Sequence, residues 1–278
     1  MNNSILRQGL RLCGIGVLFL AAALSFAQEI KEPNVAGQFY PLNPKELSQM
    51  IDGFLNAALV DEVPDIIALI SPHAGYQFSG GVAAYGYKEI KDRDYKTVVV
   101  LAASHYTPLV GISVWSDGKF RTPLGDIPVD AQFAGQLISA RQNINFLPHV
   151  FLKEHSLEVQ LPFLQKTLNN FQIVPVIMGQ FGYEDCKVFA DTLAKVIGNR
   201  TDVLVVASTD LSHFHPQPEA ESIDRQAINY VTNFDAAGLW GNSSMDDPRM
   251  CGLAPVITTL MYAQARGEEN IRILKYAN

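Results

Sequence analysis

Five residues with reactive side chains stand at positions from which they could share one site. His73, His105 and the pair Asp210 and His213 each follow a short apolar run, and Cys251 stands immediately before the last helical stretch. A helix N-terminus favours the thiolate form of cysteine. Imidazole, carboxylate and thiolate groups serve in acid–base catalysis and as metal ligands. The placement of the five residues therefore predicts a shared reactive site.

Hydrophobic periodicity predicts the elements that position these residues. Continuous apolar runs predict buried strands over residues 66–70, 97–102, 173–178 and 202–207. Pro175 favours an edge position for the third strand. Helical patterns cover residues 80–91, 130–140, 157–168, 183–196, 219–232 and 252–266. Asp130 and Asp235 stand at N-cap positions, and Gly198 and Gly267 at helix stops.

The alternation of strands and helices predicts a single layered α/β/α domain with a mostly parallel central sheet. Residues 115–130, rich in Gly, Pro and Asp, are expected to form a hairpin or a loop. Ligands bind such open sheets in the crevice outside the carboxyl ends of the strands. We therefore expect three strands to deliver His73, His105 and the Asp210/His213 pair to one edge.

Other reactive residues have plainer interpretations. Cys186, inside a helical stretch, is interpreted as structural, and His215 as a polar loop residue. Glu154 and His155 precede a helix, and the sequence leaves open whether they line the same pocket. No glycine cluster matches GxxxxGK[ST] or GxGxxG, and no GxSxG is present. The sequence therefore gives no signature of a phosphate-binding loop or a serine-hydrolase elbow.

The composition indicates a globular, acidic chain. Of its 278 residues 48% are hydrophobic, and 21 Lys and Arg stand against 28 Asp and Glu, for a formal net charge of −7. An acidic chain without a run of like charges is a poor candidate for binding nucleic acid. We expect a metal ion and a small molecule or peptide as partners.

Residues 1–27 have the pattern of a secretory signal peptide. Arg7 and Arg11 carry the charges, residues 12–24 are uncharged and mostly apolar, and Ser25-Phe26-Ala27 offers small residues before a cleavage point. The apolar run reaches about 20 Å as a helix, short of the roughly 30 Å hydrocarbon core. We expect residues 28–278 to form the exported, periplasmic or secreted domain. An uncleaved membrane anchor is the alternative. Only Cys186 and Cys251 then remain, as free thiols or as one disulfide.

Seven segments in order resemble the successive signatures of one family. They are VAGQFYP (35–41), ISPHAGYQFSG (70–80), LAASHYTPL (101–109), FRTPLGDIPVD (120–130), EHSLEVQLPFL (154–164), VASTDLSHF (206–214) and CGLAP (251–255). The chain thereby resembles the Memo family, which includes the AmmeMemoRadiSam system protein B proteins. The resemblance spans nearly the whole predicted domain.

The resemblance implies a fold similar to that of the class III (LigB-type) extradiol dioxygenases. It implies that His73, His105 and Cys251 match the family's metal ligands. Asp210 and His213 match its vestibule pair, and His213 resembles the catalytic base of the dioxygenases. Those enzymes hold non-haem iron with two histidines and a carboxylate, whereas this chain has Cys251 in the carboxylate's place. A thiolate favours Cu(I), Zn or thiolate-bound iron.

Two classes of function are compatible with this site. The first is a metal-dependent redox enzyme that uses one iron or copper ion, with His213 as acid–base residue and Asp210 orienting it or the substrate. The second is a protein that sequesters metal or binds a peptide on the dioxygenase scaffold without catalysis. Oxygen uptake with a panel of catechols would distinguish them.

Overall fold

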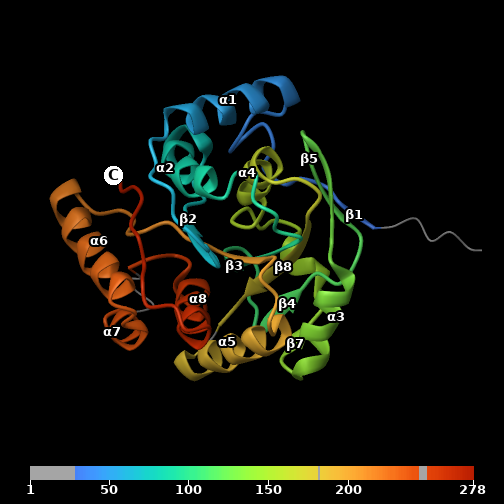
Figure 1. Ribbon diagram of the computed structural model, residues 1–278, viewed down its shortest axis with the longest axis vertical. Coiled ribbons are helices and arrows are strands. Elements are labelled where there is room, and N and C mark those ends of the chain that lie inside the picture. Colours follow the sequence, from blue (N-terminus) through green and yellow to red (C-terminus); the bar gives the residue numbers. More distant parts are fainter. Residues whose placement is uncertain (1–28, 181, 244–248) are drawn as a thin grey trace, which may run out of the picture.

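Six strands form the central sheet in the order β2-β9-β3-β8-β4-β7 (Figure 1). The computed structural model describes residues 29–180, 182–243 and 249–278, so the predicted signal peptide lies outside the described residues. The strands are β2 (Ala68–Ser71), β3 (Thr97–Ala103), β4 (Ile112–Val114), β7 (Ile144–Asn145), β8 (Gln172–Met178) and β9 (Val203–Ser208). Strands β2, β9, β3 and β8 are mutually parallel, and β4 pairs antiparallel to β8. The predicted mostly parallel sheet is confirmed.

Both faces of the sheet are buried, which explains why its strands are continuous apolar runs. Along β3, Val98 and Val100 join the core cluster on one face, whereas Val99 and Leu101 join the cluster on the other. This alternation follows from the two-residue period of a strand. The hydrophobic core therefore consists of two layers separated by the sheet.

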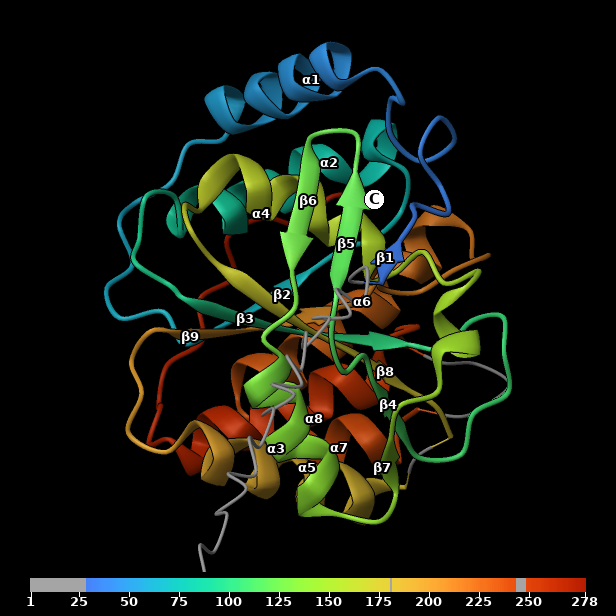
Figure 2. The same cartoon turned by 90° about the vertical axis from the view of Figure 1, so that its right-hand side faces the viewer.

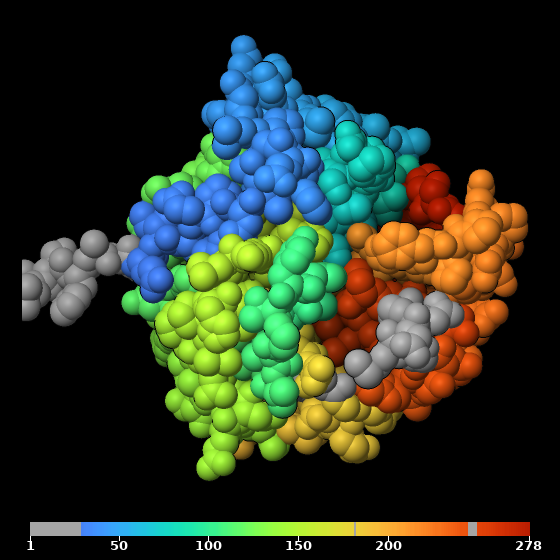
Figure 3. Space-filling model, turned by 180° about the vertical axis from the view of Figure 1, so that it is seen from behind, coloured from blue at the N-terminus to red at the C-terminus, as the bar shows by residue number. Residues whose placement is uncertain are grey.

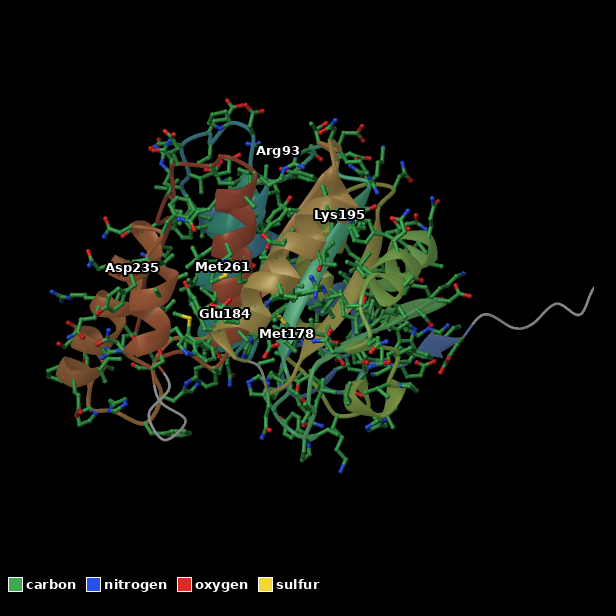
Figure 4. The ribbon with its side chains drawn as sticks, turned by 90° about the horizontal axis from the view of Figure 1, so that it is seen from below. Arg93, Met178, Glu184, Lys195, Asp235 and Met261 are labelled. Carbon is green, nitrogen blue, oxygen red and sulfur yellow. The ribbon has the colours of Figure 1, made fainter. Side chains whose placement is uncertain are left out.

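Helices cover the two faces and complete the α/β/α layering (Figures 1 and 2). On one face lie α1 (Pro44–Ala57), α2 (Tyr76–Glu89) and α4 (Leu161–Thr167). On the other lie α3 (Ala131–Ala140), α5 (Tyr183–Ile197) and α8 (Leu253–Ala265), with α6 (Gln217–Thr232) and α7 (Ala236–Gly241) outside α8. Figure 4 shows α5 and α8 side by side, with Met261 on α8 and Glu184 and Lys195 towards the two ends of α5. No helix of the described chain is long and apolar enough to cross a membrane.

The prediction that Pro175 places its strand towards an edge is wrong. Strand β8 lies inside the sheet, between β3 and β4. β4 ends at Val114, opposite Val176, and the Trp115 N–H then donates to the Pro175 carbonyl at 3.0 Å. The N–H that proline lacks therefore falls just past the end of the neighbouring strand, where the ladder stops in any case.

Most predicted helix ends are confirmed. Asp130 caps α3 by accepting from the Phe133 N–H, and Asp235 caps α7 through the Gly238 N–H. The predicted helix over residues 157–168 is divided into a short 3-10 helix η2 (Glu158–Gln160) and α4, and α2 begins at Tyr76 rather than at residue 80. Helix α1, capped by Asn43, was not predicted.

The predicted excursion over residues 115–130 forms a hairpin. Strands β5 (Lys119–Thr122) and β6 (Gly125–Pro128) pair antiparallel, and β1 (Ile30–Lys31) joins β5 in a separate small sheet (Figure 2). A second 3-10 helix, η1 (Pro148–Phe151), comes after β7. The segment between η1 and η2 lies near the carboxyl ends of the central strands, as do the predicted site residues.

Candidate metal centre

Three neighbouring strands deliver the predicted site residues to one edge of the sheet. His73 follows β2, His105 follows β3, and Asp210 follows β9, which lies between the other two. Cys251 precedes Gly252, the N-cap of α8. In Figure 3 the start of α8 is visible at the bottom of a hollow, between the segments that follow β3 and β9. The shared site predicted from the sequence therefore has a structural basis.

His73, His105 and Cys251 form a group that could hold a metal ion. One donor atom from each lies within 4.8 Å of the other two, and Sγ of Cys251 lies 3.1 Å from Nε2 of His73. The His73 side chain is 2% exposed and that of His105 25% exposed. The group is thus buried on the side of His73 and reachable from solvent on the side of His105.

Hydrogen bonds to Ser208 determine the tautomer of neutral His73. The Ser208 hydroxyl donates its single hydrogen to the Ser156 carbonyl at 2.7 Å and accepts from Nε2 of Gln160 at 2.8 Å. Its contact of 2.9 Å with Nδ1 of His73 must therefore be donated by the imidazole. Consequently Nε2 of His73 has its lone pair free, and this is the nitrogen that faces Cys251.

Glu154 orients His105 in the same manner. Nδ1 of His105 donates to Oε1 of Glu154 at 2.9 Å, and the His105 backbone N–H donates to Oε2 at 2.6 Å. The Glu154 side chain is 1% exposed, so these bonds are shielded from water. Metal-binding histidines commonly donate their second nitrogen to a carboxylate. The arrangement directs Nε2 of His105 towards Cys251.

A second group of His105, Glu154 and His155 also has metal-ligand geometry, but its carboxylate already accepts several hydrogen bonds from the protein. Oε1 of Glu154 accepts from the His155 and Ser156 backbone N–H groups, from the Ser156 hydroxyl and from His105. An ion there would have to displace these donors. The carboxylate of Glu154 therefore serves to position His105 and the segment around it.

Cys251 and His105 form a polarised pair in the metal-free protein. Burial alone would raise the pKa of Cys251, but the hydrogen bond that His105 donates lowers it to about 6. Burial alone would lower the pKa of His105, yet Cys251 and Glu154 raise it to about 10. The pair is thus a thiolate beside an imidazolium near neutral pH. An incoming cation would replace one proton.

Comparison with known proteins places the chain in a family. Residues 31–278 match the family model of the Memo-like proteins. MEMO1 family proteins of Methanobrevibacter smithii and Methanocaldococcus jannaschii are each 36% identical, over 262 and 267 residues that cover 92% of each relative. A MEMO1 family protein of Thermotoga maritima is 34% identical over 89% of this chain. The chain belongs to the Memo family.

In this Memo-family chain Asp210 and His213 lie beside the metal-ligand group and outside it. Oδ1 of Asp210 accepts from the His73 backbone N–H at 2.7 Å, and Oδ2 lies 3.9 Å from Nε2 of both His73 and His213. The His213 side chain is 44% exposed. Asp210 therefore stands between the buried His73 and the partly exposed imidazole of His213.

Several residues of the Memo-family site were not found by sequence reasoning. In the sequence Ser208 looks like the end of a strand and Gln160 like part of a helix. Neither residue therefore has a local pattern that predicts its hydrogen bonding around His73. The EHS segment did have a signal, since Glu154 and His155 are adjacent polar residues before a helix. His155 lines the site, with its ring centroid 5.3 Å from that of His73 and 4.9 Å from that of His105.

The remaining interpretations agree with the structure of this Memo-family chain. Cys186 is fully buried in α5, and burial raises the pKa of its thiol to about 12. Both Cys186 and Cys251 are free thiols. His215 lies 3.4 Å from Glu219 at the start of α6, outside both metal-ligand groups. The disulfide left open by the sequence is absent from the described residues.

Proposed function

We propose that the protein binds one iron or copper ion through Nε2 of His73, Nε2 of His105 and Sγ of Cys251. The observation that carries this proposal is the hydrogen bonding of the two imidazoles. In each, Nδ1 donates to a buried acceptor, Ser208 or Glu154, so that Nε2 is directed towards the thiolate. If the pocket served merely to bury two histidines, the Nε2 atoms of both would not need to point towards the thiolate.

The donor set fits an ion of the first transition series. Such an ion lies about 2.0–2.3 Å from imidazole nitrogen and thiolate sulfur, which sets its donors about 3–4 Å apart. The donor atoms here lie within 4.8 Å of one another. Small side-chain movements would therefore close the site. Imidazole suits iron, copper and zinc, and a thiolate favours the softer states of these ions.

We further propose that the bound ion makes the protein a redox enzyme. A redox-active ion held by His73, His105 and Cys251 would supply electron transfer to or from a substrate. The chain's own contribution is to handle a proton: His213 is partly exposed to solvent, and Oδ2 of Asp210 lies 3.9 Å from its Nε2. In this proposal His213 is the acid–base residue, and Asp210 orients it or the substrate.

Metal sequestration is the second candidate function. The feature that favours it is Cys251, since the resemblance to the dioxygenases implies a carboxylate at this position. A thiolate with two imidazoles would hold a soft ion without requiring an exchangeable substrate position. This function needs the same three ligands but no role for His213 or Asp210, so substitutions of these two residues distinguish the two functions.

Metal analysis of protein purified without chelator tests the binding site. The wild type is expected to carry about one ion per chain. His73→Ala and Cys251→Ser are expected to lose most of it, because three protein donors leave no spare ligand. His149→Ala, which changes an exposed histidine of η1, is the matched control and is expected to retain the metal. Stoichiometric metal in His73→Ala would contradict the site.

Oxygen uptake with a panel of catechols then distinguishes the two functions. For the enzyme, His213→Ala is expected to retain its metal and lose about 10²–10⁴-fold in turnover, the usual contribution of a positioned general base. Asp210→Asn is expected to lose less. Metal-loaded wild type without uptake on any catechol would favour sequestration. Loss of metal in His213→Ala would make this histidine a ligand.

A further inference from the structure

A buried carboxylate outside the metal-ligand group joins the vestibule loop to the end of the chain. Asp224, on α6, is 4% exposed. Its Oδ1 accepts from the Ser212 backbone N–H at 3.0 Å, and its Oδ2 accepts from the Tyr276 hydroxyl at 2.8 Å. Ser212 immediately precedes His213. The loop after β9, helix α6 and the last residues of the sequence thus meet at one side chain.

We propose that Asp224 and Tyr276 are positioning residues that hold the loop of residues 209–215, and with it His213, beside the candidate metal centre. The proposal deepens the proposed function and rests on it. Neither residue contacts the metal-ligand group. Both act through the backbone N–H of Ser212, the residue next to the partly exposed His213.

The beginning of this loop is held by the site itself. The Cys251 N–H donates to the Asp210 carbonyl at 3.3 Å, and the His73 N–H donates to the Asp210 carboxylate at 2.7 Å. Beyond Asp210 the loop turns outwards, and Phe214 is fully exposed with a left-handed φ of 64°. A non-glycine residue in that conformation needs surrounding contacts to hold it. The bond from Ser212 to Asp224 supplies one of them at the centre of the loop.

The end of the chain reaches Asp224 along the outside of the fold. After α8 the chain continues without helix or strand and ends between α2 and α6 (Figure 1). Nζ of Lys275 lies 5.6 Å from the centroid of the Tyr85 ring on α2, which fixes the residue next to Tyr276. Burial and the adjacent carboxylate raise the pKa of Tyr276 to about 12, so its hydroxyl remains a donor at neutral pH.

The hydrogen bond from the Tyr276 hydroxyl holds the Asp224 carboxylate in the orientation in which it accepts from the Ser212 N–H. A buried carboxylate that loses one donor must find another or admit water. Either change alters the direction in which Asp224 meets the Ser212 N–H. Tyr276→Phe removes this single bond without changing the volume of the ring, and is therefore the mildest perturbation of the arrangement.

The test measures binding of acetohydroxamate, a small chelator of metal-bound sites, to Zn²⁺-loaded protein. The chelator is expected to bind to the wild type. His213→Ala is expected to weaken this binding because the imidazole no longer contacts the chelator. Tyr276→Phe is expected to weaken binding about two- to tenfold, the range for one hydrogen bond. In the His213→Ala background, Tyr276→Phe is expected to have no further effect. A general loss of structure would weaken binding equally in both backgrounds.

Tyr95→Phe is the matched control. The Tyr95 hydroxyl also donates one hydrogen bond, to the Ile66 carbonyl at 2.5 Å, but it lies at the amino ends of the strands. It is expected to leave acetohydroxamate binding unchanged. The inference would be overturned if Tyr276→Phe weakened binding equally in both backgrounds, or had no effect in either. It would also be overturned if His213→Ala bound acetohydroxamate as tightly as the wild type. Failure of the wild type to retain any of iron, copper and Zn²⁺ would instead refute the proposed function, and the inference with it.

Discussion

At the scale of single residues, the feature that distinguishes this site is the assignment of protons around the donors. Ser208 has one hydrogen and gives it to the Ser156 carbonyl, so His73 must donate from Nδ1. Glu154 is an acceptor only, so His105 must do the same. Two groups that never touch the ion thus decide which imidazole nitrogens can bind it.

Replacing Ser208 should therefore weaken metal binding without removing a ligand. In Ser208→Ala, Nδ1 of His73 loses its acceptor, and we expect metal affinity to fall about 10- to 100-fold, as for other partners of ligating histidines. Competition with a chromogenic chelator measures this. Ser113→Ala removes a fully buried serine of β4 that is bonded to Leu147, and should retain wild-type affinity. Equal metal affinities of the wild type and both variants would contradict the assignment of the His73 hydrogen to Nδ1.

The two cysteines should differ strongly in reactivity. In metal-free native protein at pH 7, we expect iodoacetamide to modify Cys251, which is partly exposed and whose pKa is lowered to about 6. Cys186 should react only after unfolding, because it is buried and its pKa is raised to about 12. Below pH 6 the rate at Cys251 should fall about tenfold per pH unit as the thiolate is protonated. Peptide mapping by mass spectrometry measures both residues.

Bound metal should protect Cys251 from this reaction. A coordinated thiolate has its lone pair engaged, and we expect labelling to stop at one ion per chain while Cys186 remains unmodified. Rapid labelling of Cys251 in metal-loaded protein would show that sulfur is not a ligand.

At the scale of elements, the site depends on a close approach between α8 and the end of β9. A Cβ at Gly252 would lie 2.3 Å from the Ser208 carbonyl oxygen and 2.6 Å from Cβ of Thr209. The Gly252 N–H also donates to the Thr209 hydroxyl at 2.8 Å. Only glycine permits the start of α8 to rest on this strand, and that contact brings Cys251 next to His73.

Gly252→Ala should accordingly damage both stability and metal binding. The clash is with backbone, which cannot rotate away, so we expect a loss of about 1–3 kcal/mol in the free energy of unfolding and a weaker site. Thermal denaturation and metal analysis measure the two effects. Gly81→Ala on α2, where a Cβ meets nothing within 4 Å, is the control and should be neutral or slightly stabilising. Unchanged metal content in Gly252→Ala would contradict this view of α8.

At the scale of the whole molecule, one acidic α/β/α domain holds the site, preceded by a segment with signal-peptide character. Removal of residues 1–27 would take away two arginines and no acidic residue, and would change the formal net charge from −7 to −9. We predict that the exported protein begins at Gln28. Intact-mass measurement of protein from the native host's periplasmic and membrane fractions tests this. The full 278-residue mass would favour the membrane anchor.

The layered fold and the choice of reactive residues could be predicted from local patterns in the amino-acid sequence. Apolar runs over β2, β3, β8 and β9 arise from the need to bury both faces of a parallel sheet, and parallel strands place the residues after their carboxyl ends at a common edge. His73, His105, Asp210 and His213 could therefore be assigned to one site before their distances were known. Cys251 could be added because it precedes a helical stretch.

The groups that orient the candidate ligands could not be predicted from local sequence patterns. The partners of these bonds are distant along the chain: Ser208 lies 135 residues from His73, Glu154 lies 49 from His105, and Tyr276 lies 52 from Asp224. Local periodicity specifies which face of an element is buried, but it carries no information on which polar side chains meet across elements. Strand order has the same origin, since the position of β9 between β2 and β3 arises from pairing of distant segments. Pro175 was misplaced for this reason: a local preference for sheet edges did not reveal that β4 ends just where its missing N–H would be needed.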